Sequence, residues 1–400
     1  MFYGGRVRWS GQLVGTGAPP EEAEPQLALF GADSVTERTF DTPEFRGVTF
    51  YEVRAKSVLN RVPGESPMFG WTINPYRGCT HACVYCFARG THTYLDLDAG
   101  HDFDSRIVVK VNAPEVLRRE LARPSWTGEH VAMGTNVDTY QRAEGRYRLM
   151  PEIISALAAA DTPFSILTKG TLILRDQELL CSAAERVKVG LSMSIGFVDE
   201  SLWRAIEPGT PSPRRRLEAV RALNESGLGC SVLMAPILPY LTDSPEQLRA
   251  SVAAIAEAGA RSITPIVLHL RANGTREWFA AWLAERYPQL RSRYRALYGK
   301  GSYAPKWYQQ EISERVHQYA EEFGIRRPQR GDEHRVPDAG GAPEDEGVEG
   351  AARERAEGAE RGPARGATGR TRRRSGAADG GARGGDADGD GGGGEQLSLI

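Results

Sequence analysis

The sequence lacks several features that would assign it to a membrane, an export route or a polyanion. No run of about 18 apolar residues occurs, so we expect no helix that crosses a membrane. No basic stretch followed by an apolar one stands at the N-terminus, so no export signal is visible and we expect a cytoplasmic protein. The 50 basic and 52 acidic side chains nearly cancel, so any site for nucleic acid must be local.

Cysteine is also scarce, with 5 in 400 residues. An odd number in a reducing compartment argues against a framework of disulfides. Cys79, Cys83 and Cys86 crowd into the stretch GCTHACVYC at residues 78–86, which indicates metal or redox chemistry. Cys181 and Cys230 stand apart, in a helical stretch and at the start of a strand, and we expect ordinary burial for both.

Composition divides the chain into three parts. Residues 1–45 are polar and bear prolines, and we expect a loosely attached N-terminal extension. From residue 46 to residue 326, apolar segments alternate with helical patterns, which predicts a folded core. Residues 327–400 are mostly Gly, Arg, Glu, Asp and Ala, with hardly an aromatic or β-branched side chain. Such a segment cannot bury enough apolar surface to fold alone, so it predicts a disordered tail.

The core shows a repeated strand-then-helix pattern. Short apolar runs occur at residues 130–136, 164–170, 189–196, 230–238 and 263–270. Helical patterns occur at residues 150–160, 212–227 and 244–259, and the last two begin with Ser-Pro, a typical N-cap and first helical residue. Buried strands that alternate with helices predict an α/β fold with a parallel sheet or barrel, whose chemistry lies at the C-terminal ends of the strands.

Polar side chains and exposed backbone at those strand ends are the candidate site. They are Thr135, Asn136, Asp138, Thr168, Lys169, Ser192, Ser194, Ala235, Pro236, His269 and Arg271. Three arginines that open a helix, Arg214, Arg215 and Arg216, are interpreted instead as a solvated basic turn.

The spacing of the three crowded cysteines is compatible with two kinds of metal site. Three thiolates can hold three irons of a four-iron cluster and leave the fourth iron open to another ligand. A structural zinc needs four protein ligands, and His81, His92 or His101 could complete such a set. The position of the cysteines, directly after an apolar stretch at residues 69–78, and Tyr85 before the last of them favour the cluster.

These residues resemble the radical S-adenosylmethionine (SAM) enzymes, whose Cys-x3-Cys-x2-Cys loop follows the first strand of a partial (βα)6 TIM-type barrel. The stretches NPYRGC, GTNVDTYQRAEGRYRLMPEII, ILTKGTLILRD and EPGTPSPRRRLEAV resemble the spore photoproduct lyase-like branch, also called DNA repair photolyase-like. The resemblance covers about residues 46–326. It implies that fold and, as an expectation, a role in DNA lesion repair or processing.

The resemblance also implies cofactors and the residues that hold them. A 4Fe-4S cluster would be bound by Cys79, Cys83 and Cys86, reduced by a flavodoxin- or ferredoxin-type donor, and would cleave SAM to a 5′-deoxyadenosyl radical. SAM would contact the ends of the second to fifth strands. The residues implied there are Asn136, Lys169, Ser192, Ser194 and Ala235, with Asp138 at the catalytic centre.

One departure from the family concerns the return of hydrogen to the product radical. Spore photoproduct lyases carry a cysteine at the end of the second strand, but this chain has Thr135 and Asn136 there. Tyr140 is the candidate for that catalytic role. Two other interpretations stay open: a radical SAM enzyme that modifies protein, RNA or a small molecule, and a zinc-bearing module that binds nucleic acid without catalysis.

Two short segments predict a protein partner. The chain ends in QLSLI, from Gln396 to Ile400, and the N-terminal part contains QLALF, from Gln26 to Phe30. Both fit the pattern of peptides that dock in a groove of the bacterial DNA sliding clamp, where apolar side chains fill pockets and the glutamine sets the register. For the segment at residues 26–30, packing against the core is an equally simple interpretation.

Overall fold

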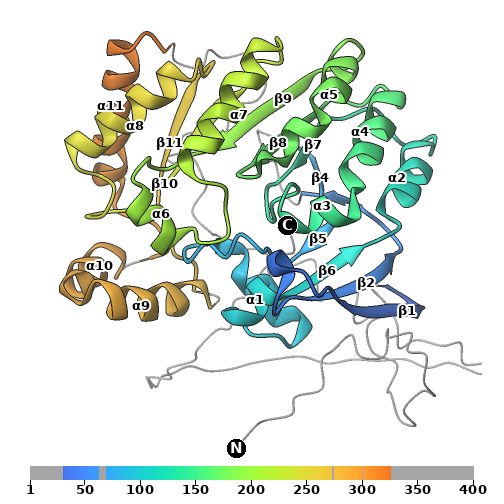
Figure 1. Cartoon of the computed structure of the whole chain (residues 1–400), viewed down its shortest axis with the longest axis horizontal. Coiled ribbons are helices and arrows are strands. Elements are labelled where there is room, and N and C mark those ends of the chain that lie inside the picture. The colour runs from blue at the N-terminus through green and yellow to red at the C-terminus, as the bar shows by residue number, and fades with distance from the viewer. Residues whose placement is uncertain (1–29, 63–68, 273, 300, 326–400) are drawn as a thin grey trace, which may run out of the picture. The chain divides into compact units, whose positions relative to one another are not determined.

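The computed structural model describes residues 30–62, 69–272, 274–299 and 301–325 (Figure 1). The tail expected at residues 327–400 lies outside these ranges, as do residues 1–29 of the expected extension. Within the described ranges, two sheets carry the fold. One has seven strands and the other has four.

The seven-stranded sheet is the partial barrel that the sequence predicts. Its order is β11-β10-β9-β8-β7-β4-β3, and every pair from β4 to β11 is parallel, whereas β3 runs antiparallel at the edge. The strands are β3 (Leu59–Arg61), β4 (Trp71–Ile73), β7 (Val131–Met133), β8 (Phe164–Thr168), β9 (Val189–Ser194), β10 (Ser231–Ile237) and β11 (Ile263–Val267).

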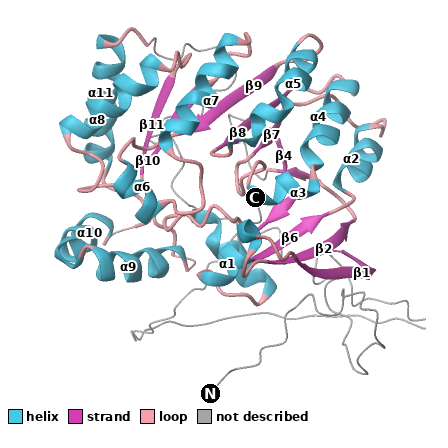
Figure 2. Cartoon of the chain, in the orientation of Figure 1, coloured by secondary structure: helices cyan, strands magenta, loops and turns pink. Residues whose placement is uncertain are grey.

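Helices follow the strands and cover one face of this sheet (Figure 2). They are α4 (Leu149–Ala159), α5 (Gln177–Ala184), α7 (Pro213–Glu225), α8 (Pro245–Glu257) and α11 (Lys306–Glu322). The expected N-caps are confirmed, because Ser212 accepts the N–H of Arg215 and Ser244 accepts the N–H of Gln247. Each cap fixes the start of its helix, and hence the length of the loop between strand and helix.

The two faces of the barrel sheet differ in exposure. In β8, Phe164, Ile166 and Thr168 are buried, whereas Ser165 and Leu167 are half-buried, as is Lys169 just beyond the strand. Neighbouring side chains on a strand point to opposite faces. The buried set therefore packs under the helices, and the half-buried set lines the interior of the partial barrel.

The four-stranded sheet, β1-β2-β6-β5, changes two expectations. Its strands are β1 (Phe30–Thr39), β2 (Thr49–Ala55), β5 (Tyr76–Arg77) and β6 (Arg106–Lys110). Because β1 pairs with β2, residues 30–39 are part of this sheet and not a separate extension. The expected first strand at residues 69–78 is divided, with β4 in the barrel and β5 paired to β6. The cysteine stretch thus begins directly after β5, at the edge of the four-stranded sheet.

Further helices lie in the connections. They are α1 (His101–Ser105), α2 (Ala113–Leu121), α3 (Arg142–Tyr147), α6 (Glu200–Ile206), α9 (Thr275–Arg286) and α10 (Arg291–Tyr298), with 3-10 helices η2 (Pro43–Phe45), η3 (Phe87–Leu95), η4 (Thr171–Asp176) and η5 (Pro288–Leu290). Among the residues described, every helix is too short or too polar to cross a bilayer.

Candidate functional site

The three crowded cysteines lie on a tight loop between β5 and η3. The backbone N–H of Cys79 donates to the carbonyl of Phe103 at 2.9 Å, and that of Cys86 donates to the carbonyl of Cys83 at 3.2 Å. The loop turns at Ala82, whose φ of 53° is unusual for a residue with a side chain. We call residues 78–86 the cysteine loop.

Two neighbouring loops hold the cysteine loop in place. Gln141, just before α3, donates through Nε2 to the carbonyl of Gly78 and accepts the backbone N–H of Thr80, both at 3.0 Å. From the other side, Gly209 donates its N–H to the carbonyl of His81 at 3.0 Å. A Cβ atom at Gly209 would lie 2.1 Å from the carbonyl oxygen of Thr80, so only glycine permits this approach. The protein alone thus fixes the path of the loop.

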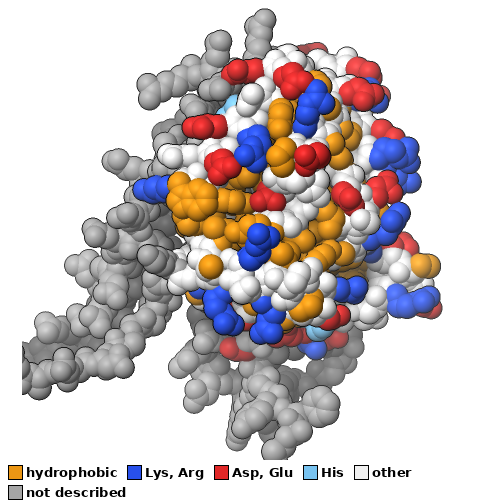
Figure 3. Space-filling model, turned by 90° about the vertical axis from the view of Figure 1, so that its left-hand side faces the viewer, with side chains coloured by type: hydrophobic (Ala, Val, Ile, Leu, Met, Phe, Trp, Pro, Cys, Tyr) orange, Lys and Arg blue, Asp and Glu red, His pale blue; other side chains and the backbone are white. Residues whose placement is uncertain are grey.

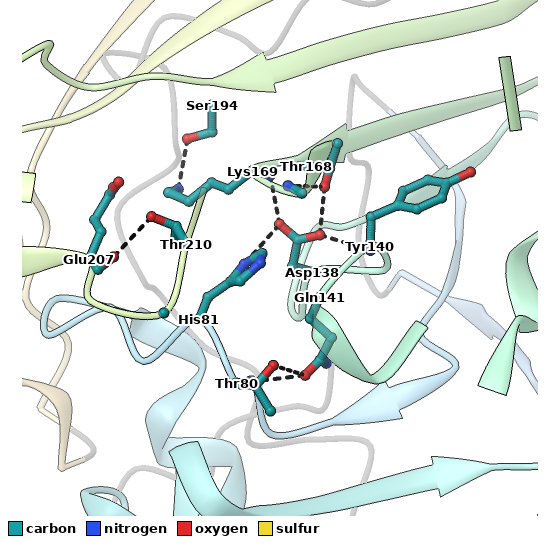
Figure 4. Close-up of polar contacts among 12 residues, drawn as sticks. Thr80, His81, Asp138, Tyr140, Gln141, Thr168, Lys169, Ser194, Glu207 and Thr210 are labelled. Atoms are coloured by element: carbon teal, nitrogen blue, oxygen red, sulfur yellow. Dashed lines mark hydrogen bonds and ion pairs between the residues drawn. The ribbon is translucent and has the colours of Figure 1, made fainter. Parts of the chain in front are cut away.

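Asp138 joins the cysteine loop to the ends of β7 and β8 (Figure 4). Its Oδ1 accepts the backbone N–H of Tyr140 at 2.9 Å and the hydroxyl of Thr168 at 2.6 Å. Its Oδ2 accepts the backbone N–H of Lys169 at 2.6 Å and lies 3.3 Å from Nδ1 of His81. Burial would raise the pKa of Asp138, but these partners outweigh it and lower the pKa to about 2.

Three predicted site residues from adjacent strands, Lys169, Ser194 and Ala235, are joined by hydrogen bonds. The Nζ of Lys169 donates to Oγ of Ser194 at 2.7 Å, and that hydroxyl donates to the carbonyl of Ala235 at 3.0 Å. The same ammonium group lies 5.6 Å from the ring centroid of Tyr85 in the cysteine loop. Lys169, Ser194 and Ala235 therefore meet beside the cysteines, on the half-buried side of the barrel.

The remaining predicted cofactor residues lie close in the fold but make no contact that defines a role. Ser192 is half-buried in β9, two residues before Ser194 and on the same face of the strand. Asn136 is half-buried in the loop after β7. Next to it, the buried hydroxyl of Thr135 has no hydrogen-bond partner among the described residues, and neither has Oδ1 of Asn74 after β4. Such orphaned polar atoms at strand ends suit a polar ligand.

Tyr140 is placed differently from what its predicted role requires. Its hydroxyl donates to Oδ2 of Asp176 at 3.0 Å, and its ring is 1% exposed. Burial and the nearby carboxylate of Asp176 raise its pKa well above the ordinary value. In Figure 4 the ring points away from His81 and Lys169. That Tyr140 returns a hydrogen atom to the product radical stays a prediction, and the orientation of its ring does not favour this role.

A buried network that the sequence analysis did not predict lies on the other side of the cysteine loop. The hydroxyl of Tyr85 donates to Glu207. Arg216 donates to Oε2 of Glu207 at 2.5 Å and to the carbonyl of Ser194 at 2.9 Å. Both members of the ion pair are fully buried, and although burial would raise the pKa of Glu207, Arg216 and Lys169 lower it overall.

The interpretation of residues 214–216 as a solvated basic turn is wrong for the last of them. Arg214 and Arg215 are exposed, but Arg216 is fully buried. It begins the apolar face of α7 that continues with Ala219, Val220 and Leu223, at the spacing of one helix face. That periodicity was the signal in the sequence that could have found it.

The donor atoms fit an iron–sulfur cluster better than zinc. His81 contacts Asp138, Nε2 of His92 lies 2.9 Å from the carbonyl of Arg106, and His101 packs on Trp278. In the ranges that the structure describes, no three His, Cys, Asp or Glu side chains converge where one metal ion could sit. A cluster that takes one thiolate on each of three irons does not require such convergence.

Burial affects the ionisation of the three thiols. It raises the pKa of Cys79, Cys83 and Cys86, although the charge of Lys169 acts in the opposite direction at the last two. A buried thiol ionises readily only when a cation compensates its charge, as a bound metal does. The thiols are therefore protonated in the apoprotein at neutral pH, and a bound cation would favour their thiolate form.

A cavity of about 230 Å³ opens beside His81. Its lining comes from the loops after β7 and β8 and from the segment between α6 and α7. The exposed side chains of Arg142 and Arg215 lie on its border, together with the hydroxyls of Thr171 and Thr210. The cavity thus offers two cations and the side chain of Thr171 next to the cysteine loop, whereas the Thr210 hydroxyl already donates to the carbonyl of Glu207.

Replacing Asp138 tests the connection between the loops. Because the folded protein holds the pKa of this carboxylate near 2, below the ordinary 3.8, its contribution is present above pH 4 and is lost as the pH falls towards 2. Asp138→Asn should lower the free energy of unfolding of the apoprotein at pH 7 by about 2 kcal/mol. Urea unfolding at several pH values measures this difference, which should shrink below about pH 4.

Asp161→Asn is the matched control. Its side chain is 79% exposed, and its φ of 46° suits asparagine equally well. This variant should stay within about 0.5 kcal/mol of the wild type. Equal stability of Asp138→Asn and Asp161→Asn at pH 7 would show that Asp138 does not hold the site together.

Comparisons with known proteins agree with this geometry. Residues 73–252 match the model of the radical SAM superfamily. An uncharacterized protein of Mycobacterium tuberculosis is 51% identical over 313 residues, which cover 78% of this chain and 91% of the relative. An uncharacterized protein of Methanocaldococcus jannaschii is 30% identical over 196 residues, 49% of this chain and 70% of the relative.

Among solved structures, spore photoproduct lyase in complex with dinucleoside spore photoproduct is similar with a TM-score of 0.51. The match has 17% sequence identity and covers 69% of this chain and 79% of that chain, so it concerns the fold. The fold is thus similar to that of spore photoproduct lyase, and the chain is an enzyme of the radical SAM superfamily.

Proposed function

We propose that this radical SAM enzyme holds a 4Fe-4S cluster on Cys79, Cys83 and Cys86, binds SAM beside Lys169, and acts on DNA in lesion repair or processing. Membership of the superfamily implies SAM and an iron–sulfur cluster. The observation that carries the assignment is the contact series from Lys169 through Ser194 to Ala235, directly beside the cysteine loop.

The three thiols suit a cluster with one open iron, and the neighbouring groups suit the ligand of that iron. When bound and reduced, the cluster supplies the electron that cleaves SAM to a 5′-deoxyadenosyl radical, which takes hydrogen from the substrate. Lys169 supplies a cation for the carboxylate of SAM. Ser192, Ser194 and the backbone of Ala235 offer hydroxyls and a carbonyl for its ribose and adenine, and Asn136 and Thr135 add polar groups from the loop after β7.

The residues around the loop prepare this site before any ligand arrives. Asp138 fixes the backbone of Lys169, and therefore the point from which its side chain reaches the cysteines. Tyr85, Glu207 and Arg216 close the opposite side and leave no space there for bulk water, since the ion pair is fully buried. Such preorganisation avoids the cost of ordering the site during the reaction.

A DNA substrate is supported by two observations of different kinds. The similar solved structure is of a lyase that binds a dinucleoside photoproduct. In this chain, Arg142 and Arg215 border the cavity beside His81, where they could contact phosphates. Product analysis after incubation of reduced protein and SAM with UV-damaged DNA tests the reaction. Conversion of protein or RNA but not of DNA would refute this part of the proposal.

Removal of one cysteine tests the cluster. Because each cysteine supplies one of only three protein ligands, Cys83→Ala should reduce iron well below the roughly four atoms of a full cluster and abolish formation of 5′-deoxyadenosine. Cys181→Ala is the matched control, since Cys181 lies in α5, away from the cysteine loop. Iron analysis and chromatography of the nucleoside measure both effects. Equal losses in the two variants would contradict the assignment.

Replacement of Lys169 tests the binding of SAM. Lys169→Ala removes a charge-assisted contact of roughly 1.5–3 kcal/mol, so SAM should bind about 10- to 150-fold more weakly while the iron content is retained. Lys188→Ala, an exposed change at the opposite end of β9, should bind SAM normally. Calorimetric titration measures both affinities. Unchanged affinity of Lys169→Ala would leave this residue only a structural role.

The proposed partners are an electron donor of the flavodoxin or ferredoxin type and the DNA sliding clamp. Both clamp-like segments lie outside the described residues, except for Phe30 at the start of β1. A peptide that ends in Leu397, Leu399 and Ile400 should bind purified clamp with a Kd of about micromolar order, because few anchors bury a small surface. Leu399→Ala should weaken the binding free energy of the peptide by about 1–3 kcal/mol, as measured by fluorescence polarisation.

The intact chain should bind the clamp more tightly than either peptide, because two linked segments act on a multivalent ring. Mutation of the glycine-rich spacer before Gln396 should change the affinity for the clamp little, because the spacer serves only as a flexible tether. If neither the peptides nor the intact chain bind the clamp at roughly 100 μM, both segments are accidental matches to the pattern.

A further inference from the structure

A row of aromatic rings leads from the cysteine loop to the surface. Phe87 directly follows Cys86, and its ring centroid lies 5.4 Å from that of His269. The ring of His269 lies 5.5 Å from that of Tyr303, and the planes are inclined by only 40° and 31° along the row. Tyr303 at the outer end is 44% exposed, so a ligand can reach its side chain.

The fold brings this row to the same end of the barrel as the candidate site. His269 lies just beyond β11 and pairs with Tyr303 in an antiparallel bridge. The hydroxyl of Thr275, at the start of α9, donates to the carbonyl of Cys86 at 3.2 Å. The segments after β11 therefore rest on the cysteine loop, at the C-terminal ends of the parallel strands where substrates of such barrels bind.

The surroundings of the row are apolar and basic. Trp307, at the start of α11, is 62% exposed, and with Tyr303 it makes up the exposed large hydrophobic side chains of the described residues. Lys306 next to it is exposed, and the guanidinium of Arg271 lies 5.3 Å from the ring centroid of Phe87. Figure 3 shows the side where α8 to α11 lie, with hydrophobic side chains gathered in patches and basic ones beside them.

The rings are neutral at physiological pH. Burial, helped by the charge of Arg271, lowers the pKa of His269 to about 4, so its imidazole stays uncharged between Phe87 and Tyr303. A neutral planar row with cations at its border matches a single-stranded nucleic acid, whose bases stack on aromatic faces while phosphates attract Lys and Arg. An apolar peptide would not need the cations.

We propose that Tyr303 and Trp307 form a base-stacking subsite for an unpaired nucleotide of single-stranded DNA, with Lys306 and Arg271 near its phosphates. The row that ends at Phe87 would align the nucleotide chain with the mouth of the barrel, so that a neighbouring base reaches the cysteine loop. This inference rests on the proposed DNA substrate and names the part of the chain that receives it.

Binding of a labelled oligodeoxythymidylate to the full chain, measured by fluorescence anisotropy, tests the subsite. Tyr303→Leu removes the stacking face but keeps an apolar side chain, and should weaken binding about 5- to 150-fold, as expected for loss of one stacked base. Tyr303→Phe should bind like the wild type. Trp307→Leu should be weaker than Trp307→Phe, and Lys306→Gln should reduce the slope of log K against log salt by about 0.7.

Phe323→Ala is the control, because Phe323 lies at the far end of α11 and packs under Arg249. It should bind the oligonucleotide as the wild type does, and thermal unfolding checks that all variants are folded. If the wild type binds but Tyr303→Leu binds equally well, the subsite is wrong and the DNA proposal survives. If the wild type forms 5′-deoxyadenosine but binds peptide or donor protein and no oligonucleotide at this surface, the subsite is refuted, and product analysis with UV-damaged DNA decides the DNA substrate separately.

Discussion

The buried carboxylate of Asp138 is the interaction on which the candidate site depends. It receives hydrogen bonds from the backbone after β7, from Thr168 and from the N–H of Lys169, and it contacts His81 of the cysteine loop. A buried charge is tolerated only when such donors surround it. Since the donors come from three separate segments, the chain cannot solvate this carboxylate without also assembling the cysteine loop beside Lys169.

Cationic side chains around the cysteine loop partly compensate the negative charge that three thiolates would carry. Three thiolates would bring negative charge into a place where burial already raises the thiol pKa values. Lys169 lies over Tyr85, Arg216 is paired with Glu207, and fully buried Arg89 donates to the carbonyl of Cys83 at 2.9 Å while binding Asp104. The protein thus supplies a polar cage for the loop, and a bound cation supplies the remaining charge.

The extent to which the fold and the candidate site could be predicted from the sequence differs from element to element. The helices at Ser212 and Ser244 could be predicted because an N-cap and a following proline act locally. The division of residues 69–78 could not, because β5 is defined by its pairing with β6, some thirty positions away along the chain. Likewise, the cysteine spacing was visible, but the bond from His81 to Asp138 exists only once two distant loops meet.

These contacts bind the cysteine loop at three points. Asp138 and Gly209 hold it at His81, Glu207 closes it at Tyr85, and Thr275 binds the carbonyl of Cys86. Towards β8 the loop faces Lys169, and the orphaned polar atoms of Asn74 and Thr135 lie just beyond the ends of β4 and β7. A buried hydroxyl without a partner costs about 1–3 kcal/mol, which folding alone does not recover. These strand ends are therefore where a polar ligand gains most, because it satisfies groups that the protein leaves unsatisfied.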